Sequence, residues 1–548
     1  MRSLRRGYSC LLAIFVMLQA TVGVGYAYCE VFSEAQQAAC ALYELGLFHG
    51  TGVAADGSPI FELERSPSRY EAVTMLVRLL GKESEALGGS WCTPFSDVAD
   101  WAKPYVGFAY EYGLSSGTSS TTYSGEISVS AAQYLTFLLR ALGYSSGSDF
   151  HWDRAWELTD RIGITHGEYG SGADFTRGDV AVVSYRALSA SLKGQDVTLL
   201  DKLAEGMVFP ADSSFEITFI DVGQADAALV RCDGHSMLID GGNVADSQRL
   251  YSFLRDRGVT HLDYLVCTHP HEDHVGGLAG ALNYARVERA FCSMTAYDSA
   301  AFNNFVRYLE RQGKEIEVPR VGECHRLGSS FVQVLGPVKT SDNVNNMSIV
   351  LRFVYGNISF LFTGDAERDE EADILDAGYR LRSTVLKVGH HGSADSTTYP
   401  FLREVAPQFA VISVGSGNPY GHPTENTLSR LRDADVMVYR TDMQGDVLCT
   451  SDGKSVKFSV SRNSGADTLG NAGSKQGTVI NGSGQHEPEE SANATDSATY
   501  VLNTNTMRFH LPTCSSVEQM SARNKLDFSG SRDEVLEMGY VPCSCCHP

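Results

Sequence analysis

The stretch that decides the fold runs from Tyr264 to His274 and reads YLVC followed by THPHEDH. Its first four residues are typical of a short buried strand, and VGGL at 275–278 indicates that a helix begins after the motif. The candidate metal ligands of this turn are His269, His271, Asp273 and His274. Imidazoles and carboxylates suit zinc or a similar divalent ion, and the spacing lets two pairs of ligands face two ions. A chance surface cluster is the alternative, but further ligand types follow downstream.

Several motifs flank this turn in a consistent order. They are ITFIDVGQADAALV (217–230), LIDGG (238–242), NNMS (345–348), FLFTGD (360–365), LKVGHHGS (386–393) and YGHP (420–423). Together with the HxHxDH pattern they resemble the metallo-β-lactamase superfamily and, in this order, the hydrolase domain of ComEC-type competence proteins, which are linked to DNA uptake. The alternation of strand-like and helical segments indicates an α/β domain. The resemblance refines this to a four-layer αββα sandwich.

The resemblance implies two bound ions, Zn²⁺ or alternatively Mn²⁺. His269 and His271 are expected to bind the first ion, whereas Asp273 and His274 bind the second. Asp365 is expected to bridge both ions. Because neighbouring residues on a strand point in opposite directions, one of His390 and His391 is expected to complete the second site, with His391 preferred.

The surroundings of these ligands are also predicted. Many members of the superfamily have a further histidine on the first metal, where this chain has Asn345, Asn346 and Ser348, so the first site is expected to be more open. Asn346 and Ser348 are therefore expected in the outer shell. Asp240 is expected there too, orienting a ligand histidine, although it could equally be a turn residue.

Two adjacent ions favour hydrolysis of a phosphodiester by a metal-bound hydroxide. The expected catalytic residues are Asp273 as a ligand, and His390 and His422 as proton donors to the leaving oxygen. Lys387 and Ser393 are candidate phosphate contacts.

The length and charge of the chain limit the number of domains and the kinds of partner that it can have. A chain of 548 residues is too long for one core, and its net charge of −22 argues against a general attraction to polyanions. Residues 1–27 resemble a secretory signal peptide, with three arginines before an apolar run at 10–24. A retained anchor is the alternative, although this run is short for spanning. After signal removal we expect no integral membrane segment, unlike the polytopic ComEC-type proteins.

Residues 28–194 contain three degenerate units of two helices each, which predicts an all-α repeat domain. FSDV (95–98), SRYE (68–71) and TRGD (176–179) resemble S-layer homology repeats. The resemblance implies attachment to an anionic secondary cell-wall polymer, with Arg69 and Arg177 as polymer contacts, and hence a secreted protein on the cell wall. The middle unit has no such arginine. An ordinary helical bundle is the alternative.

The remaining boundaries follow from composition. Residues 195–213 are predicted to be a connection, 214–461 the hydrolase domain, and 462–499 a disordered linker that is poor in large apolar residues. Residues 500–548 resemble an Ada-like metal-binding module. Its expected zinc ligands are His510, Cys514, Cys543 and Cys546, with disulfides as the alternative.

The sequence thus favours an exported, wall-attached binuclear phosphodiesterase, and first of all a DNA nuclease. One alternative is hydrolysis of teichoic-acid or phosphocholine-type wall polymers. The other is a non-catalytic, wall-bound interaction protein.

Overall fold

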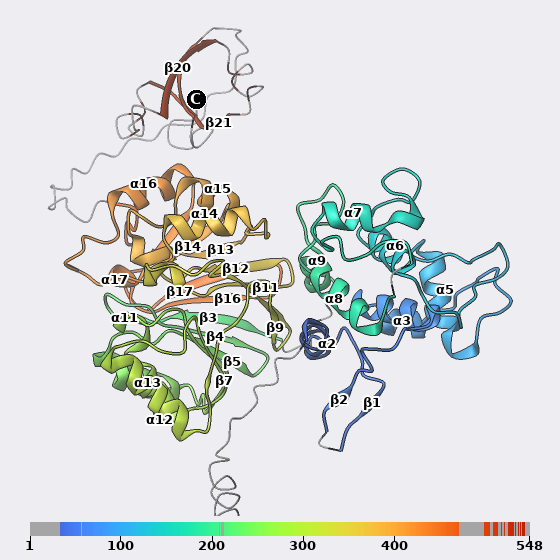
Figure 1. The fold of residues 1–548 in the computed structure, drawn as a ribbon. Helices are drawn as coiled ribbons and strands as arrows, with labels where there is room; N and C mark the ends of the chain where they lie inside the picture. Colours follow the sequence, from blue (N-terminus) through green and yellow to red (C-terminus); the bar gives the residue numbers. More distant parts are fainter. Residues whose placement is uncertain are drawn as a thin grey trace, which may run out of the picture.

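The computed structural model describes residues 33–470, apart from 56, 173, 208 and 210–212, and parts of 498–542. The predicted signal peptide and residues 471–497 of the predicted linker lie outside the described residues. The described chain forms a helical repeat domain, a central domain of two sheets and a small C-terminal sheet (Figure 1). None of its described helices is long and apolar enough to span a membrane.

The repeat domain begins its main helices at sequence-encoded caps. Its helices are α2 (Glu34–Glu44), α3 (Arg69–Leu79), α4 (Glu83–Gly88), η1 (Asp100–Ala102), α5 (Lys103–Glu111), α6 (Ala131–Ala141), η2 (Trp152–Arg154), α7 (Trp156–Arg161) and α8 (Arg177–Ala187). Ser68, Ser130 and Thr176 form capping boxes at the starts of α3, α6 and α8. A hairpin of β1 (Gly52–Val53) and β2 (Pro59–Ile60) is also present, so the all-α prediction was wrong in this detail.

Arg69 and Arg177 lie inside this domain, with 3% and 4% of their surface exposed. The Arg69 guanidinium donates to the carbonyls of Tyr123 and Ser116, at 3.3 and 3.0 Å. That of Arg177 donates to the carbonyls of Phe61 and His49, at 2.8 and 3.3 Å. Both arginines therefore tie loops of different repeats together, and their contact with a polymer stays a prediction.

The predicted connection contains a helix, α9 (Leu199–Glu205), which begins at a capping box of Thr198 and Asp201. Asp201 pairs with Arg352 (2.8 Å) and Arg380 (3.0 Å) of the central domain. The Arg352 side chain is only 2% exposed. The segment therefore joins the two domains through buried ion pairs, in addition to connecting them along the chain. We call these ion pairs of Asp201 the brace.

The central domain consists of two mixed sheets. One has the order β17 (Val456–Val460), β16 (Val447–Ser451), β3 (Phe215–Phe219), β4 (Ala228–Cys232), β5 (His235–Ile239), β6 (His261–Cys267), β7 (Arg286–Cys292) and β8 (Ile316–Glu317). The other has the order β15 (Met437–Arg440), β14 (Phe409–Ile412), β13 (Val385–Lys387), β12 (Ile358–Phe362), β11 (Val350–Tyr355), β10 (Ser330–Gly336) and β9 (Cys324–Leu327).

The two sheets pack face to face through an apolar core. Phe215 stacks on Phe360 and Phe219 on Phe362, with ring centroids 4.9 and 5.6 Å apart. The first sheet is covered by α10 (Ser247–Asp256), α12 (Leu278–Tyr284) and α13 (Ala300–Arg311), and the second by α14 (Arg368–Asp376), α15 (Tyr399–Val405) and α16 (Glu425–Asp433). The shorter elements are η3 (Val244–Asp246), α11 (Glu272–Val275), η4 (Val344–Met347), η5 (Gly389–Gly392) and α17 (Thr441–Gln444). The predicted four-layer sandwich is confirmed.

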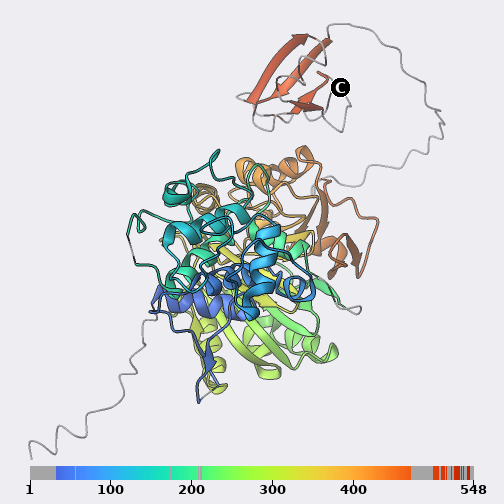
Figure 2. The same cartoon turned by 90° about the vertical axis from the view of Figure 1, so that its right-hand side faces the viewer.

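The repeat domain packs against the edge of the second sheet (Figures 1 and 2). The backbone N–H of Cys324 donates to Tyr185 Oη (2.7 Å), and Arg326 of β9 donates to the carbonyl of Leu45 (3.0 Å). An edge strand has unpaired backbone groups that invite association, and the repeats cover this one.

The predicted linker, residues 462–499, overlaps at both ends with parts of the chain that are packed or paired in the structure. Residues 463–470 still pack on the central domain, where Arg440 donates to the carbonyl of Thr468 (3.3 Å). The small sheet has the order β20 (Lys525–Gly530), β18 (Ala498–Asn503), β19 (Arg508–His510) and β21 (Val541–Pro542). Its Arg508 pairs with Asp435 beside α16 (2.6 Å).

The brace at Asp201 yields a stability prediction. Asp201→Asn should lower the free energy of unfolding by about 3–5 kcal/mol, because it leaves the buried Arg352 without its counter-charge. Urea unfolding followed by circular dichroism measures this loss. Burial opposes ionisation of Asp201, but Arg352, the hydrogen bonds from Thr198 and Arg380 together outweigh it and lower the pKa below the ordinary 3.8. The stabilisation should therefore persist above about pH 4 and disappear as the pH falls through the lowered pKa.

The matched control is Asp196→Asn. Asp196 also pairs with Arg380 (2.8 Å), but its side chain is 70% exposed, so the loss should stay below about 1 kcal/mol. Equal losses in the two variants would contradict the role of the brace.

Candidate metal centre

The candidate ligands meet at one edge of the sandwich because of strand direction. Strands β5 and β6 are parallel, so Asp240 and the motif that begins at Thr268 follow them at the same edge. Strands β12 and β13 are also parallel, and they bring Asp365 and the His390-His391 pair to the facing edge of the second sheet. Residues of both sheets therefore converge on one point, as is usual at the carboxyl ends of strands in α/β folds.

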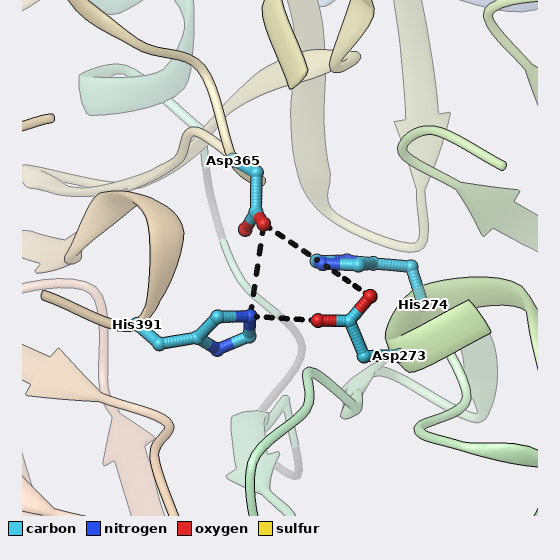
Figure 3. Close-up of side chains that lie close together, drawn as sticks. All are labelled: Asp273, His274, Asp365 and His391. Atoms are coloured by element: carbon cyan, nitrogen blue, oxygen red, sulfur yellow. Dashed lines mark ion pairs between the residues drawn. The ribbon is translucent and has the colours of Figure 1, made fainter. Parts of the chain in front are cut away.

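Four side chains form the centre of this cluster: Asp273, His274, Asp365 and His391 (Figure 3). One potential ligand atom from each lies within 4.8 Å of the others. Asp365 Oδ2 is 3.3 Å from His274 Nε2 and 3.6 Å from His391 Nε2. Asp273 Oδ2 is 3.3 Å from His391 Nε2. Asp365 thus lies between two imidazoles and opposite a second carboxylate.

The far nitrogens of these imidazoles are held by the protein. His274 Nδ1 is 2.9 Å from Asp240 Oδ2, which also accepts from the Thr268 hydroxyl (2.8 Å). His391 Nδ1 is 3.0 Å from the carbonyl oxygen of Ser413. Both Nε2 atoms are buried and make no hydrogen bond among the described residues. This is the arrangement in which an imidazole presents its free nitrogen to a metal.

His269 and His271 lie next to the central four. His269 Nε2 is 3.0 Å from His271 Nδ1, and the ring centroids of His269 and His274 are 4.2 Å apart. Ser348 Oγ is 3.3 Å from His269 Nδ1 and accepts from the N–H of Asp365 (3.0 Å). Ser348 therefore contacts both His269 and Asp365 without being one of the four central side chains.

Two asparagines of the NNMS motif form hydrogen bonds with Glu367, which follows Asp365 in the chain. Asn346 Oδ1 accepts from the Glu367 N–H (2.9 Å), and Asn345 donates to Glu367 Oε1 (2.7 Å). The predicted outer-shell residues Asn346 and Ser348 thus contact groups beside the ligands.

His390 and His391 both face the centre, contrary to the alternation expected on a strand. The pair lies in the short turn η5, where both backbones are left-handed, with φ of 47° and 52°. His390 Nε2 is 3.6 Å from Asp365 Oδ2, the same distance as His391 Nε2. Such backbone strain in non-glycine residues persists only where the surrounding structure holds it, and it is common at functional sites.

Charge is distributed unevenly in the cluster. Burial lowers the pKa of His269 well below 6.5, which leaves a neutral imidazole. Burial acts in the same direction on His391, but Asp365 and Asp226 outweigh it and raise its pKa to about 10. Burial opposes ionisation of Asp273, yet His274 and His391 lower its pKa to about 2. The buried carboxylates thus demand positive charge, which protons supply here and a divalent ion can supply instead.

These residues fit a metal site. The free Nε2 atoms of His274 and His391, with carboxylates of Asp273 and Asp365 opposite, give a mixed nitrogen and oxygen donor set that suits zinc or manganese. The adjacent His269–His271 pair offers two further imidazole nitrogens. The number of ligands and their division between two groups favour two ions.

His422 lies beside His390, with the two ring centroids 5.5 Å apart. Burial, followed by the charges of His390 and His391, lowers its pKa to about 4. An imidazole that is neutral at pH 7 is a poor proton donor, which disfavours the predicted role of His422 as the donor to the leaving oxygen.

Lys387 is not available to a substrate, contrary to its candidate role as a phosphate contact. It is 4% exposed and its Nζ lies 2.8 Å from Asp226 Oδ2, while Asp226 Oδ1 is 3.4 Å from His391 Nδ1. Sequence reasoning did not assign this buried pair a role. In the sequence, the two residues are notable only because Asp226 lies in the DVGQAD motif and Lys387 in the LKVGHHGS motif.

The tail site is described in part. His510 and Cys514 are both buried, whereas Cys543 and Cys546 lie outside the described residues. The type of this small sheet module and its zinc site stay predictions.

Comparisons with known proteins agree with this centre. Residues 220–416 match the metallo-beta-lactamase superfamily. The central domain is a metallo-beta-lactamase domain. The chain is 29% identical over 260 residues to ComE operon protein 3 of Bacillus subtilis, covering 44% of this chain and 34% of that protein. It is 32% identical over 231 residues to competence protein ComA of Neisseria gonorrhoeae, covering 42% and 31%.

Part of the chain is also similar to a cell-surface protein. That protein, from Thermoanaerobacter kivui, is 26% identical over 262 residues, which cover 44% of this chain and 33% of the relative. The chain thus spans about a third of the length of each of these relatives.

Orientation of His274 yields a prediction on metal affinity. Asp240→Asn should weaken zinc binding by about 10–100-fold, because it removes the carboxylate that fixes this imidazole. Competition with a chromogenic chelator measures the affinity, and circular dichroism checks the fold.

Asp263→Asn is the matched control, since Asp263 of β6 makes a similar contact with His235 of β5 (2.7 Å) and neither residue belongs to the candidate ligand cluster. Unchanged zinc affinity in Asp240→Asn, or an equal loss in the control, would contradict this role of Asp240.

Proposed function

We propose that the metallo-beta-lactamase domain is a metal-dependent phosphodiesterase that cleaves DNA. The observation that carries the proposal is the convergence of Asp273, His274, Asp365 and His391 beside the His269–His271 pair. The donor set favours hydrolysis, because imidazoles and carboxylates can hold Lewis-acid ions such as Zn²⁺, and none of the four central side chains is a serine or cysteine nucleophile. DNA as the substrate is supported by the similarity of this part of the chain to competence proteins.

When bound, divalent ions would supply Lewis-acid chemistry, which activates water as a nucleophile and offsets the negative charge of a phosphodiester. Asp240 and the Ser413 carbonyl orient two of the imidazoles that hold them. His390, whose side chain is 23% exposed, is the imidazole with access to both solvent and Asp365. We therefore propose that His390 delivers a proton to the leaving oxygen.

We also propose that the N-terminal repeats display this enzyme on the cell wall by binding an anionic wall polymer. The proposal is supported by the similarity to a cell-surface protein and by the three capped helical units. Because the chain carries a net charge of −22, capture of DNA must depend on local contacts at the centre rather than on the overall field.

The direct test is hydrolysis of linear single- and double-stranded DNA by the intact chain with added Zn²⁺ or Mn²⁺. Asp365→Ala should reduce turnover at least about 100-fold, because it removes the carboxylate that lies between the two imidazoles. Asp369→Ala, an exposed position four residues further along, should leave turnover unchanged.

Two outcomes would redirect the assignment. Release of p-nitrophenol from a phosphocholine diester without DNA cleavage would favour a wall-polymer phosphodiesterase. Absence of hydrolysis of either substrate by the metal-loaded chain would favour a non-catalytic, wall-bound protein.

A further inference from the structure

An exposed tyrosine is connected to the metal centre by ring contacts. Tyr420 lies in the loop between β14 and α16, and 68% of its surface is exposed. Its ring stacks on that of His422, with centroids 5.7 Å apart and an interplanar angle of 30°. His422 in turn contacts His390, which faces Asp365. A large aromatic face is therefore open to solvent within two ring contacts of a candidate metal ligand.

The loop that carries Tyr420 is fixed by one side chain. Asn418 Oδ1 accepts from the backbone N–H groups of Tyr420 (3.1 Å) and His422 (3.0 Å). Its amide nitrogen donates to the carbonyls of Gly415 (2.9 Å) and His422 (2.6 Å). These four bonds fix the backbone of the loop on both sides of Tyr420.

The ring contacts continue without a break through the centre. From Tyr420 they pass through His422, His390, His391, His274, His269 and His271 to Tyr297. A tyrosine thus stands at each end of the histidine series. Tyr297 is partly buried and packs on Phe302 (6.3 Å), so Tyr420 is the end that is free to receive a planar group.

We propose that Tyr420 is a stacking platform for a nucleobase next to the phosphodiester in the metal centre. The inference rests on the proposed function and adds a contact that would hold a nucleic-acid strand at the metal centre. Stacking on an aromatic face tolerates any base and contributes strongly to the binding of single strands. A chain with a net charge of −22 cannot rely on general attraction to phosphates, which makes such uncharged contacts more important.

The test compares a fluorescent single-stranded oligothymidylate with an abasic tetrahydrofuran strand of the same length. Binding is measured by anisotropy with EDTA present, so that no cleavage occurs, and KM and kcat are measured separately with metal. Tyr420→Ala should weaken binding of oligothymidylate about 10-fold and raise its KM by a similar factor. The abasic strand should bind both proteins equally, and Tyr420→Phe should restore wild-type binding.

Tyr112→Ala is the matched control, because Tyr112 is a tyrosine of the repeat domain that is 55% exposed. It should change neither binding nor KM. Equal effects of Tyr420→Ala on the two strands, or no effect on either, would overturn the platform while DNA cleavage by the wild type upheld the proposed function. Weaker binding of phosphocholine with unchanged binding of oligothymidylate would also overturn it, in favour of a quaternary ammonium group.

Failure of the proposed function gives a different pattern. A wild-type chain that binds oligothymidylate through Tyr420 but cleaves no DNA would refute the nuclease and retain the platform. A chain that binds neither strand would refute both.

Discussion

The burial of several carboxylates beside imidazoles is the constraint on which the rest of the structure depends. A buried charge is costly unless it is paired and hydrogen-bonded. Asp226 is paired with Lys387, and Asp240 accepts from Thr268 and faces His274. Asp365 comes from the second sheet and the THPHEDH turn from the first, so the centre forms only when both sheets pack together. The apolar layer between the sheets thereby fixes the geometry of the polar edge.

Sequence patterns predicted the helices of the repeats and the α/β class of the central domain, whereas the family resemblance supplied its four layers. Capping boxes at Ser68, Ser130 and Thr176 were not used for that prediction, although capping residues act within one turn and mark these helix starts. The helix α9 was missed, although Thr198 and Asp201 carry the same capping signal, because the segment is short and lies between two domains. The hairpin of β1 and β2 was missed because strands of two residues have no periodicity to detect.

The candidate site was predicted where ligands are adjacent in sequence and less well where they depend on backbone shape. The HxHxDH turn and Asp365 were found, but the left-handed turn that points both His390 and His391 inward cannot be read from residue types. The contact of Lys387 with Asp226 joins residues far apart in the chain. Arg69 was expected to contact a wall polymer, yet in the structure it is buried and donates to backbone carbonyls of distant residues, which residue types alone do not reveal.

The central claim is that this centre binds two divalent ions. Anomalous diffraction at the zinc edge from crystals of the intact chain grown with Zn²⁺ tests it most directly. The account predicts two peaks about 3.5–4 Å apart, one beside His269 and His271 and the other beside Asp273, His274 and His391, with Asp365 between them. A single peak, or none at these side chains, would contradict it.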